Sequence, residues 1–131
     1  MRYLIDSHTF LWFGTEDPLL PDRIREIISD PDNDIKISIA SFWEIGIKYS
    51  VGKLPLKANV LGLEQQARDL DITIVPITMS AIHQITLMPQ HHRDPFDRII
   101  IATALTTGEA ILSADAVFDV YGVARVWDAI F

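Results

Sequence analysis

Short apolar runs alternate with longer amphipathic segments along the whole chain. The apolar runs predict buried strands at residues 3–5, 35–39, 72–75 and 110–112, with a short fifth strand at 124–126. Helical spacing, bounded by capping residues, glycine or proline, predicts helices at residues 8–13, 21–29, 41–51, 59–70, 78–87 and 95–107. This alternation predicts an α/β fold, in which helices cover both faces of a parallel sheet of four to five strands.

Four acidic residues lie just after predicted strands or near the starts of predicted helices. Asp6 directly follows the first strand, and Asp115 follows the fourth. Glu44 and Asp97 lie near the starts of two predicted helices. Parallel sheets place their functional sites beyond the carboxyl ends of the strands. We therefore expect these four acids, although distant in sequence, to converge at one edge of the sheet.

Helical spacing indicates which way two of these acids face. Asp97 is four and seven residues before Ile101 and Ala104. In the same way, Glu44 precedes two apolar residues at positions 47 and 51. We expect these apolar residues to face the core, and the carboxylates to point inward with them. An inward carboxylate is costly unless it is paired or binds a metal ion.

Capping explains each acid equally well when it is taken alone. Ser41 and Glu44 have the spacing of a capping box, and Asp115 can cap a turn that begins at Ala116. Taken together, the acids repel one another, by about 4 kcal/mol for two unit charges 4 Å apart at an effective dielectric of 20. A divalent cation removes this repulsion, and oxygen ligands favour Mg²⁺ or Mn²⁺.

Composition narrows the function classes. The 131 residues, 49% of them hydrophobic, are expected to form one domain. The net charge of −7 argues against non-specific binding to nucleic acid but not against a metal-dependent nuclease. The chain has no cysteine, which excludes a disulfide framework and a cysteine nucleophile. No apolar stretch approaches the roughly 20 residues needed to span a bilayer, so we expect a cytoplasmic protein without membrane contact.

Four sequence blocks together resemble a known family. They are Leu4–His8, Ser41–Lys48 with Gly52–Leu54, His92–Ala104, and Ser113–Tyr121. In this order they resemble the PIN-domain ribonucleases, and within them the VapC-type toxins of bacterial toxin–antitoxin pairs. The resemblance covers nearly the whole chain. It implies a Rossmann-like α/β/α sandwich over residues 1–131, Mg²⁺ or Mn²⁺ at the acids, and endonucleolytic cleavage of RNA. It also implies a homodimer and a small protein antitoxin that blocks the site.

The third block contains two acids, Asp94 and Asp97. We assign the metal-binding role to Asp97, because residues 101–104 follow it in the family's pattern. Asp94 is then a helix cap that pairs with Arg98 four residues later. The histidine and arginine at positions 92 and 93 form a loop that is either a phosphate contact or merely solvated.

Further polar residues adjoin the four acids. Ser7 and Ser113 are candidates to orient water or ligands, although either could simply cap a helix or turn. Lys48 is a candidate contact for the RNA backbone, but an ion pair with Glu44 explains it equally well. These residues, with Asp94, Arg98, His92 and Arg93, complete the set of candidate substrate-contacting or ligand-orienting residues.

The preferred function is a metal-dependent endoribonuclease in which Asp6, Glu44, Asp97 and Asp115 bind the metal and act in catalysis. One alternative is a non-catalytic or antitoxin-type binding module, whose acids only support partner docking. Another is a metal-dependent phosphohydrolase of the haloacid-dehalogenase type. That class requires a second aspartate two residues after the first, where this chain has His8.

Overall fold

The computed structural model describes residues 1–56 and 59–127. Its sheet consists of β1 (Arg2–Ile5), β2 (Asp34–Ser38), β3 (Thr73–Val75), β4 (Ala110–Leu112) and β5 (Arg125–Val126). The helices are α1 (Ser7–Gly14), α2 (Asp22–Ser29), α3 (Ile39–Ser50), α4 (Val60–Asp69), α5 (Met79–Leu87) and α6 (Pro95–Thr107), and η1 (Ala116–Tyr121) is a 3-10 helix. The strands pair in the order β3-β2-β1-β4-β5, and all four pairings are parallel. The predicted α/β fold is thus confirmed, with five strands.

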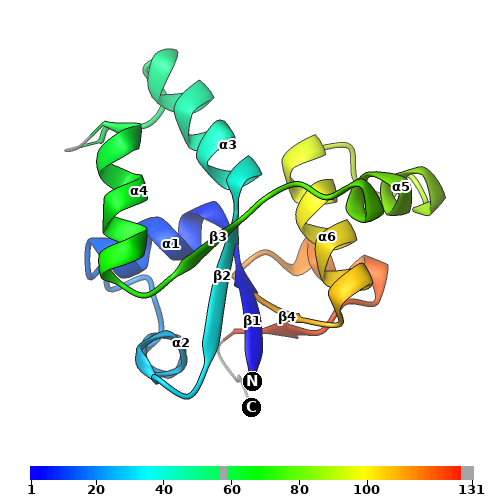
Figure 1. Ribbon diagram of the computed structural model, residues 1–131. Coiled ribbons are helices and arrows are strands. Elements are labelled where there is room, and N and C mark those ends of the chain that lie inside the picture. Colours follow the sequence, from blue (N-terminus) through cyan, green and yellow to red (C-terminus); the bar gives the residue numbers. More distant parts are fainter. Residues whose placement is uncertain (57–58, 128–131) are drawn as a thin grey trace.

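Side chains alternate between the two faces of the central strand β1. Tyr3 and Ile5 pack into one cluster with residues of α1, α2 and α4, whereas Leu4 packs into a second cluster with α5 and α6. This alternation follows from the two-residue period of a strand. Helices therefore cover both faces of the sheet, as Figure 1 shows.

Helix α3 departs from the sequence-based prediction. The Ser38 hydroxyl accepts a hydrogen bond from the Ala40 N–H at 3.1 Å, so the helix begins at Ile39. Ser41 is consequently not a cap, which rules out the capping box that was the alternative explanation of Glu44. The expectation that Ile47 faces the core is also wrong, because its exposed fraction is 42% and that of Val51 is 60%. In Figure 1, α3 extends away from the sheet, which leaves these residues uncovered.

The other helices agree with prediction to within a few residues. Pro21 lies just before α2 rather than within it, and Asn59 and Thr78 cap α4 and α5 with their side chains. Helix η1 was expected only as a turn after Asp115. Within residues 1–56 and 59–127, no helix has the length and apolar character that a bilayer span requires.

Candidate active site

The strand order creates a crevice between two neighbouring strands. From β1 the chain continues outward to β2 and then β3, whereas β4 lies on the other side of β1. Asp6 follows β1 directly, and Ser113 follows β4. Ligands of open α/β sheets bind at such a point, beyond the carboxyl ends of the strands. The sequence therefore brings two polar segments, more than 100 residues apart, to one place.

Asp6 is fixed through both carboxylate oxygens. As the N-cap of α1, it accepts a hydrogen bond from the Thr9 N–H to Oδ1 at 3.0 Å. The Ser113 hydroxyl donates to Oδ2 at 2.5 Å, and the carboxylate residue is only 8% exposed. The Asp6 side chain therefore caps α1, and Ser113 holds the same carboxylate in one orientation.

Glu44 projects from α3 toward the same crevice. The Ser7 hydroxyl donates to Oε1 at 2.8 Å, and Lys48 donates to Oε2 at 3.2 Å. Ser7 therefore orients Glu44, rather than capping a helix with its hydroxyl. The predicted helix ion pair of Lys48 is present, and the lysine also lines the cleft.

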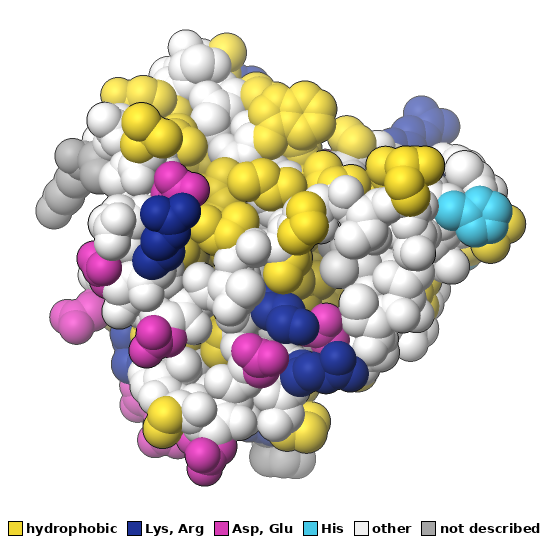
Figure 2. Space-filling model, in the orientation of Figure 1, with side chains coloured by type: hydrophobic (Ala, Val, Ile, Leu, Met, Phe, Trp, Pro, Cys, Tyr) yellow, Lys and Arg dark blue, Asp and Glu magenta, His cyan; other side chains and the backbone are white. Residues whose placement is uncertain are grey.

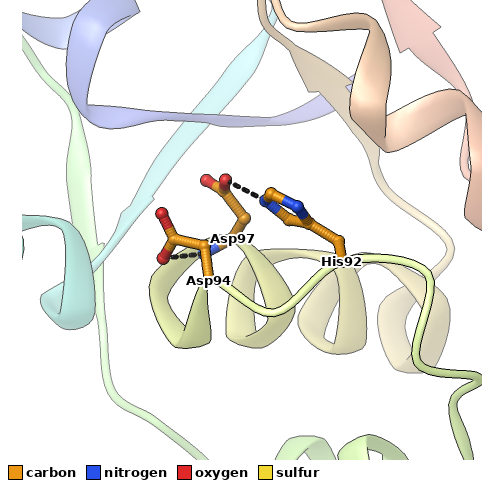
Figure 3. A group of neighbouring side chains, drawn as sticks. All are labelled: His92, Asp94 and Asp97. Atoms are coloured by element: carbon orange, nitrogen blue, oxygen red, sulfur yellow. Dashed lines mark hydrogen bonds and ion pairs between the residues drawn. The ribbon is translucent and has the colours of Figure 1, made fainter.

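Asp94, Asp97 and His92 gather at the start of α6, as Figure 3 shows. His92 Nε2 lies 2.7 Å from Asp97 Oδ2. Asp94 Oδ1 caps the helix by accepting from the N–H groups of Phe96 and Asp97, at 2.9 and 3.4 Å. One ligand atom from each of His92, Asp94 and Asp97 lies within 4.8 Å of the others. Asp94, expected from sequence to cap the helix and also named as a candidate ligand-orienting residue, thus caps α6 and adjoins the acidic cluster.

Burial raises the pKa of Asp97 from 3.8 to about 6. The hydrogen bond and charge of His92 oppose this rise, whereas the negative charges of Asp94 and Glu44 add to it. A carboxyl group whose charged form is disfavoured in this way is stabilised in that form by a nearby cation. The electrostatics of Asp97 therefore suit a position beside a metal ion.

Asp115 lies on the exposed side of the crevice. Its Oδ1 accepts from the Val117 N–H at 3.0 Å, so it caps η1 as predicted for a turn at this point. Its own N–H donates to the Ser113 hydroxyl at 3.0 Å. Ser113 thus joins Asp115 to Asp6, because the same hydroxyl donates to Asp6.

All four predicted acids line one cleft of about 350 Å³. The lining also includes Ser7, Lys48 and Asp94, together with two residues that the sequence did not suggest, His8 and Trp12. These two lie four residues apart on α1, with ring centroids 5.7 Å apart. The sequence did contain a signal for them. Because α1 begins at the crevice, residues spaced by four just after Asp6 can lie along it.

Two predicted residues lie elsewhere or act differently. Arg98 is buried at 6% exposure, and its guanidinium donates to backbone carbonyls and to a tyrosine hydroxyl, not to Asp94. The predicted Asp94–Arg98 pair is therefore wrong: Asp94 Oδ1 is directed to the amides of its own helix. Arg93 is exposed and does not line the cleft.

The donor set of the cleft fits a divalent cation. Five carboxylates line it, and Lys48 is the one lysine or arginine among the described lining residues. Carboxylate oxygens are the ligands that Mg²⁺ and Mn²⁺ prefer. Serine hydroxyls or His92 already hold three of the five carboxylates in fixed orientations, as neighbours of metal ligands commonly do.

Comparisons with known proteins agree with this fold. The family model of the PIN domain matches residues 3–124. Ribonuclease VapC22 of Mycobacterium tuberculosis is 27% identical over 113 residues, which are 86% of this chain and 85% of that protein.

Solved structures share the fold at lower identity. A chain of VapBC2 from Rickettsia felis, bound to a promoter DNA fragment, superposes with a TM-score of 0.70 at 14% identity, covering 98% of this chain and 100% of that one. A chain of a toxin–antitoxin complex from Klebsiella pneumoniae gives 0.56 at 14% identity, covering 87% of each. At these identities the likeness shows the fold alone.

Proposed function

This chain belongs to the PIN domain family, and we propose that it is a metal-dependent endoribonuclease that acts in the cytoplasm as the toxin of a toxin–antitoxin pair. We also propose that residues 1–131 form one such domain. The ribonuclease activity named for the M. tuberculosis relative supports the reaction class. The observation that carries the proposal is the convergence of Asp6, Glu44, Asp97 and Asp115 in one cleft.

In this proposal the four acids hold Mg²⁺ or Mn²⁺ directly or through water. When bound, such a cation supplies a Lewis acid that stabilises negative charge on a phosphoryl oxygen and lowers the pKa of water. The chain's own hydroxyls keep the acids in place, since Ser7 holds Glu44 and Ser113 holds Asp6. Burial raises the pKa of Asp97 to about 6 in the metal-free chain, and a bound cation would lower it again, so Asp97 would hold the ion as a charged carboxylate.

Lys48 completes the proposed site as a phosphate contact. Its Nζ uses one donor on Glu44, and the side chain keeps 40% exposure on the cleft side of α3. An ammonium group has three donors, so two remain for a phosphodiester. The cleft is otherwise rich in negative charge, and a positive group at its edge offsets the repulsion of an entering phosphate.

We propose a small protein antitoxin as one partner. The K. pneumoniae structure with this fold is described as a toxin–antitoxin complex. Co-expression of the chain with the product of the adjacent reading frame, followed by co-purification and an RNA cleavage assay, tests this partner. Loss of cleavage in the complex is expected, and full cleavage by a stable complex would contradict it.

We propose a second copy of this chain as the other partner. Figure 2 shows hydrophobic side chains gathered over α3 and toward α5. The α3 stripe, defined as Ile39, Trp43 and Ile47, has exposed fractions of 44%, 63% and 42%. An apolar surface of this kind is typical of an interface. Trp43→Lys is expected to convert a dimer to a monomer in sedimentation experiments, whereas Leu19→Lys, at an exposed apolar residue outside the stripe, leaves the mass unchanged.

Incubation of total cellular RNA with the purified chain tests the reaction. Cleavage is expected with Mn²⁺ or Mg²⁺ and should cease with excess chelator, and mapping of the cut ends identifies the bond broken. Asp6→Asn serves as the matched inactive protein, which excludes a contaminating nuclease. Cleavage that persists in chelator, or that survives in Asp6→Asn, would contradict the proposal.

A further inference from the structure

A buried arginine without an acidic partner holds the loop beside the cleft. Arg98 Nη1 donates to the carbonyl oxygens of Pro89 and His92, both at 3.1 Å, and Nη2 donates to that of Ile85 at 3.2 Å. None of the ion pairs among the described residues includes Arg98. A buried charge requires hydrogen bonds, and this guanidinium obtains them from the end of α5 and the segment after it.

Tyr121 holds the same loop from a third element. Its hydroxyl, on η1, donates to the Pro89 carbonyl at 3.0 Å. The same oxygen accepts from the His92 N–H at 2.8 Å and from Arg98 Nη1 at 3.2 Å. One phenolic oxygen thus makes three hydrogen bonds that join η1, α6 and the loop.

His92 is consequently fixed at three atoms. Its N–H is bound by Tyr121, its carbonyl oxygen by Arg98, and its Nε2 lies 2.7 Å from Asp97 Oδ2. The two backbone hydrogen bonds fix the position of the His92 main chain, from which the imidazole reaches Asp97. Among the described residues, Oδ1 of Asp97 receives no hydrogen bond, and Figure 3 shows the carboxylate beside the imidazole, joined to it by a dashed line.

We propose that His92 is a positioning residue that orients the Asp97 carboxylate toward the cleft, and that Arg98 and Tyr121 keep His92 in place. The inference rests on the proposed function in that it takes Asp97 as a cation ligand. The partner of a metal-ligating group fixes its orientation, and loss of such a partner typically costs about 10–100-fold in metal affinity or activity. In this proposal His92 acts through Asp97 and is not itself a ligand of the cation or a contact of the RNA.

Tyr121→Phe is the decisive variant, because it removes one oxygen and keeps the ring in place. Tyr3→Phe is the matched control, since Tyr3 is buried on the opposite face of the sheet in a different cluster. His92→Ala gives the full effect for comparison. The measurements are Mn²⁺ affinity by calorimetry, ring-nitrogen NMR signals of His92 in labelled protein, and RNA cleavage with kcat and KM separated.

His92→Ala is expected to weaken Mn²⁺ binding by about 10–100-fold, and Tyr121→Phe by about 10-fold, at the lower end of that range. Tyr121→Phe should also move the His92 ring signals toward those seen in Asp97→Asn, while Tyr3→Phe changes neither. Saturating Mn²⁺ should restore much of kcat, with KM for RNA unchanged.

Two results would overturn the inference. One is a raised KM for RNA with unaltered Mn²⁺ affinity, which would make His92 a substrate contact. The other is a His92 ring signal that Tyr121→Phe leaves unchanged. Failure of the proposed function is distinguishable, because a chain that binds Mn²⁺ as expected but cuts no RNA would refute the nuclease and leave the role of His92 standing.

Discussion

Glu109 and Glu44 are similarly enclosed carboxylates at opposite ends of the sheet. Glu109 precedes β4 and lies 3.6 Å from Lys36 of β2, with 5% exposure. Glu44, with 8% exposure, shares its cleft with four other acids and one lysine. Burial is therefore common to both ends, whereas an excess of carboxylates over cations distinguishes the carboxyl end. That excess, rather than burial, is the feature on which we base the proposed active site.

The largest difference between the two ends should appear in catalysis. Asp6→Asn is expected to lower RNA cleavage by at least about 10²–10³-fold, because it removes a charge proposed to stabilise the reacting groups. Asparagine is also a good N-cap, so the helix start at α1 should persist. Cleavage rates and circular dichroism measure the two effects. Glu109→Gln is the control and should leave the rate per folded molecule unchanged. An equal loss of cleavage rate in both variants would show that the two ends of the sheet do not differ in catalysis.

For the free energy of unfolding, the larger effect is expected at the amino end of the sheet. Lys36→Met leaves Glu109 buried without its cation, which is expected to lower the free energy of unfolding by about 3 kcal/mol. Urea unfolding measures the loss, and adding Glu109→Gln to the same chain should recover much of it. An unchanged urea midpoint in Lys36→Met would show that the Lys36–Glu109 pair does not contribute to stability.

The carboxylates of the cleft should also make the stability of the chain depend on pH. Because burial raises the pKa of Asp97 to about 6, the folded state holds this proton more tightly than the unfolded state, where the value is 3.8. Stability of the metal-free chain should therefore fall as pH rises from about 4 to 6, by about 2 kcal/mol given the side chain's 19% exposure.

Asp97→Asn should lack this loss. It should then be more stable than the parent chain at pH 7.5 and similar to it below pH 4, as measured by thermal unfolding in chelator. The same pH profile in both proteins would contradict the assignment to Asp97.

The smallest effect is expected at the edge of the cleft. Lys48→Met removes a half-exposed helix ion pair, which is worth only about 0.3–0.5 kcal/mol of stability. If Lys48 contacts phosphate, KM for RNA should rise by about 10-fold, equivalent to about 1.4 kcal/mol. Lys53→Met is a suitable control for general charge. A stability loss without a change in KM would restrict Lys48 to supporting Glu44.

Prediction from sequence was most accurate for residues whose position depends only on where a strand ends. Asp6 and Asp115 follow β1 and β4, and parallel pairing brings strand ends together whatever the side chains do. For both residues the capping and cleft positions, weighed as alternatives, coexist. A carboxylate can therefore cap its own helix and still line the cleft, as Asp6 does although both of its oxygens accept hydrogen bonds.

Prediction was weaker where a helix leaves the sheet or a loop folds back. The spacing of Glu44, Ile47 and Val51 indicates a shared face but not whether anything covers it, and α3 extends beyond the sheet. The choice of Ser38 over Ser41 as cap depended on where β2 ends. The contact of His92 with Asp97 depends on Arg98 and Tyr121, which no local pattern connects to it.

The α3 stripe lies on the same helix that presents Glu44 to the cleft. Trp43, within it, packs edge-on against Phe96 with ring centroids 5.2 Å apart, and Phe96 immediately precedes Asp97. A small molecule seated against Trp43 would thus touch the supports of two acids from outside the cleft. The stripe and the cleft are thus built on the same two helices, α3 and α6.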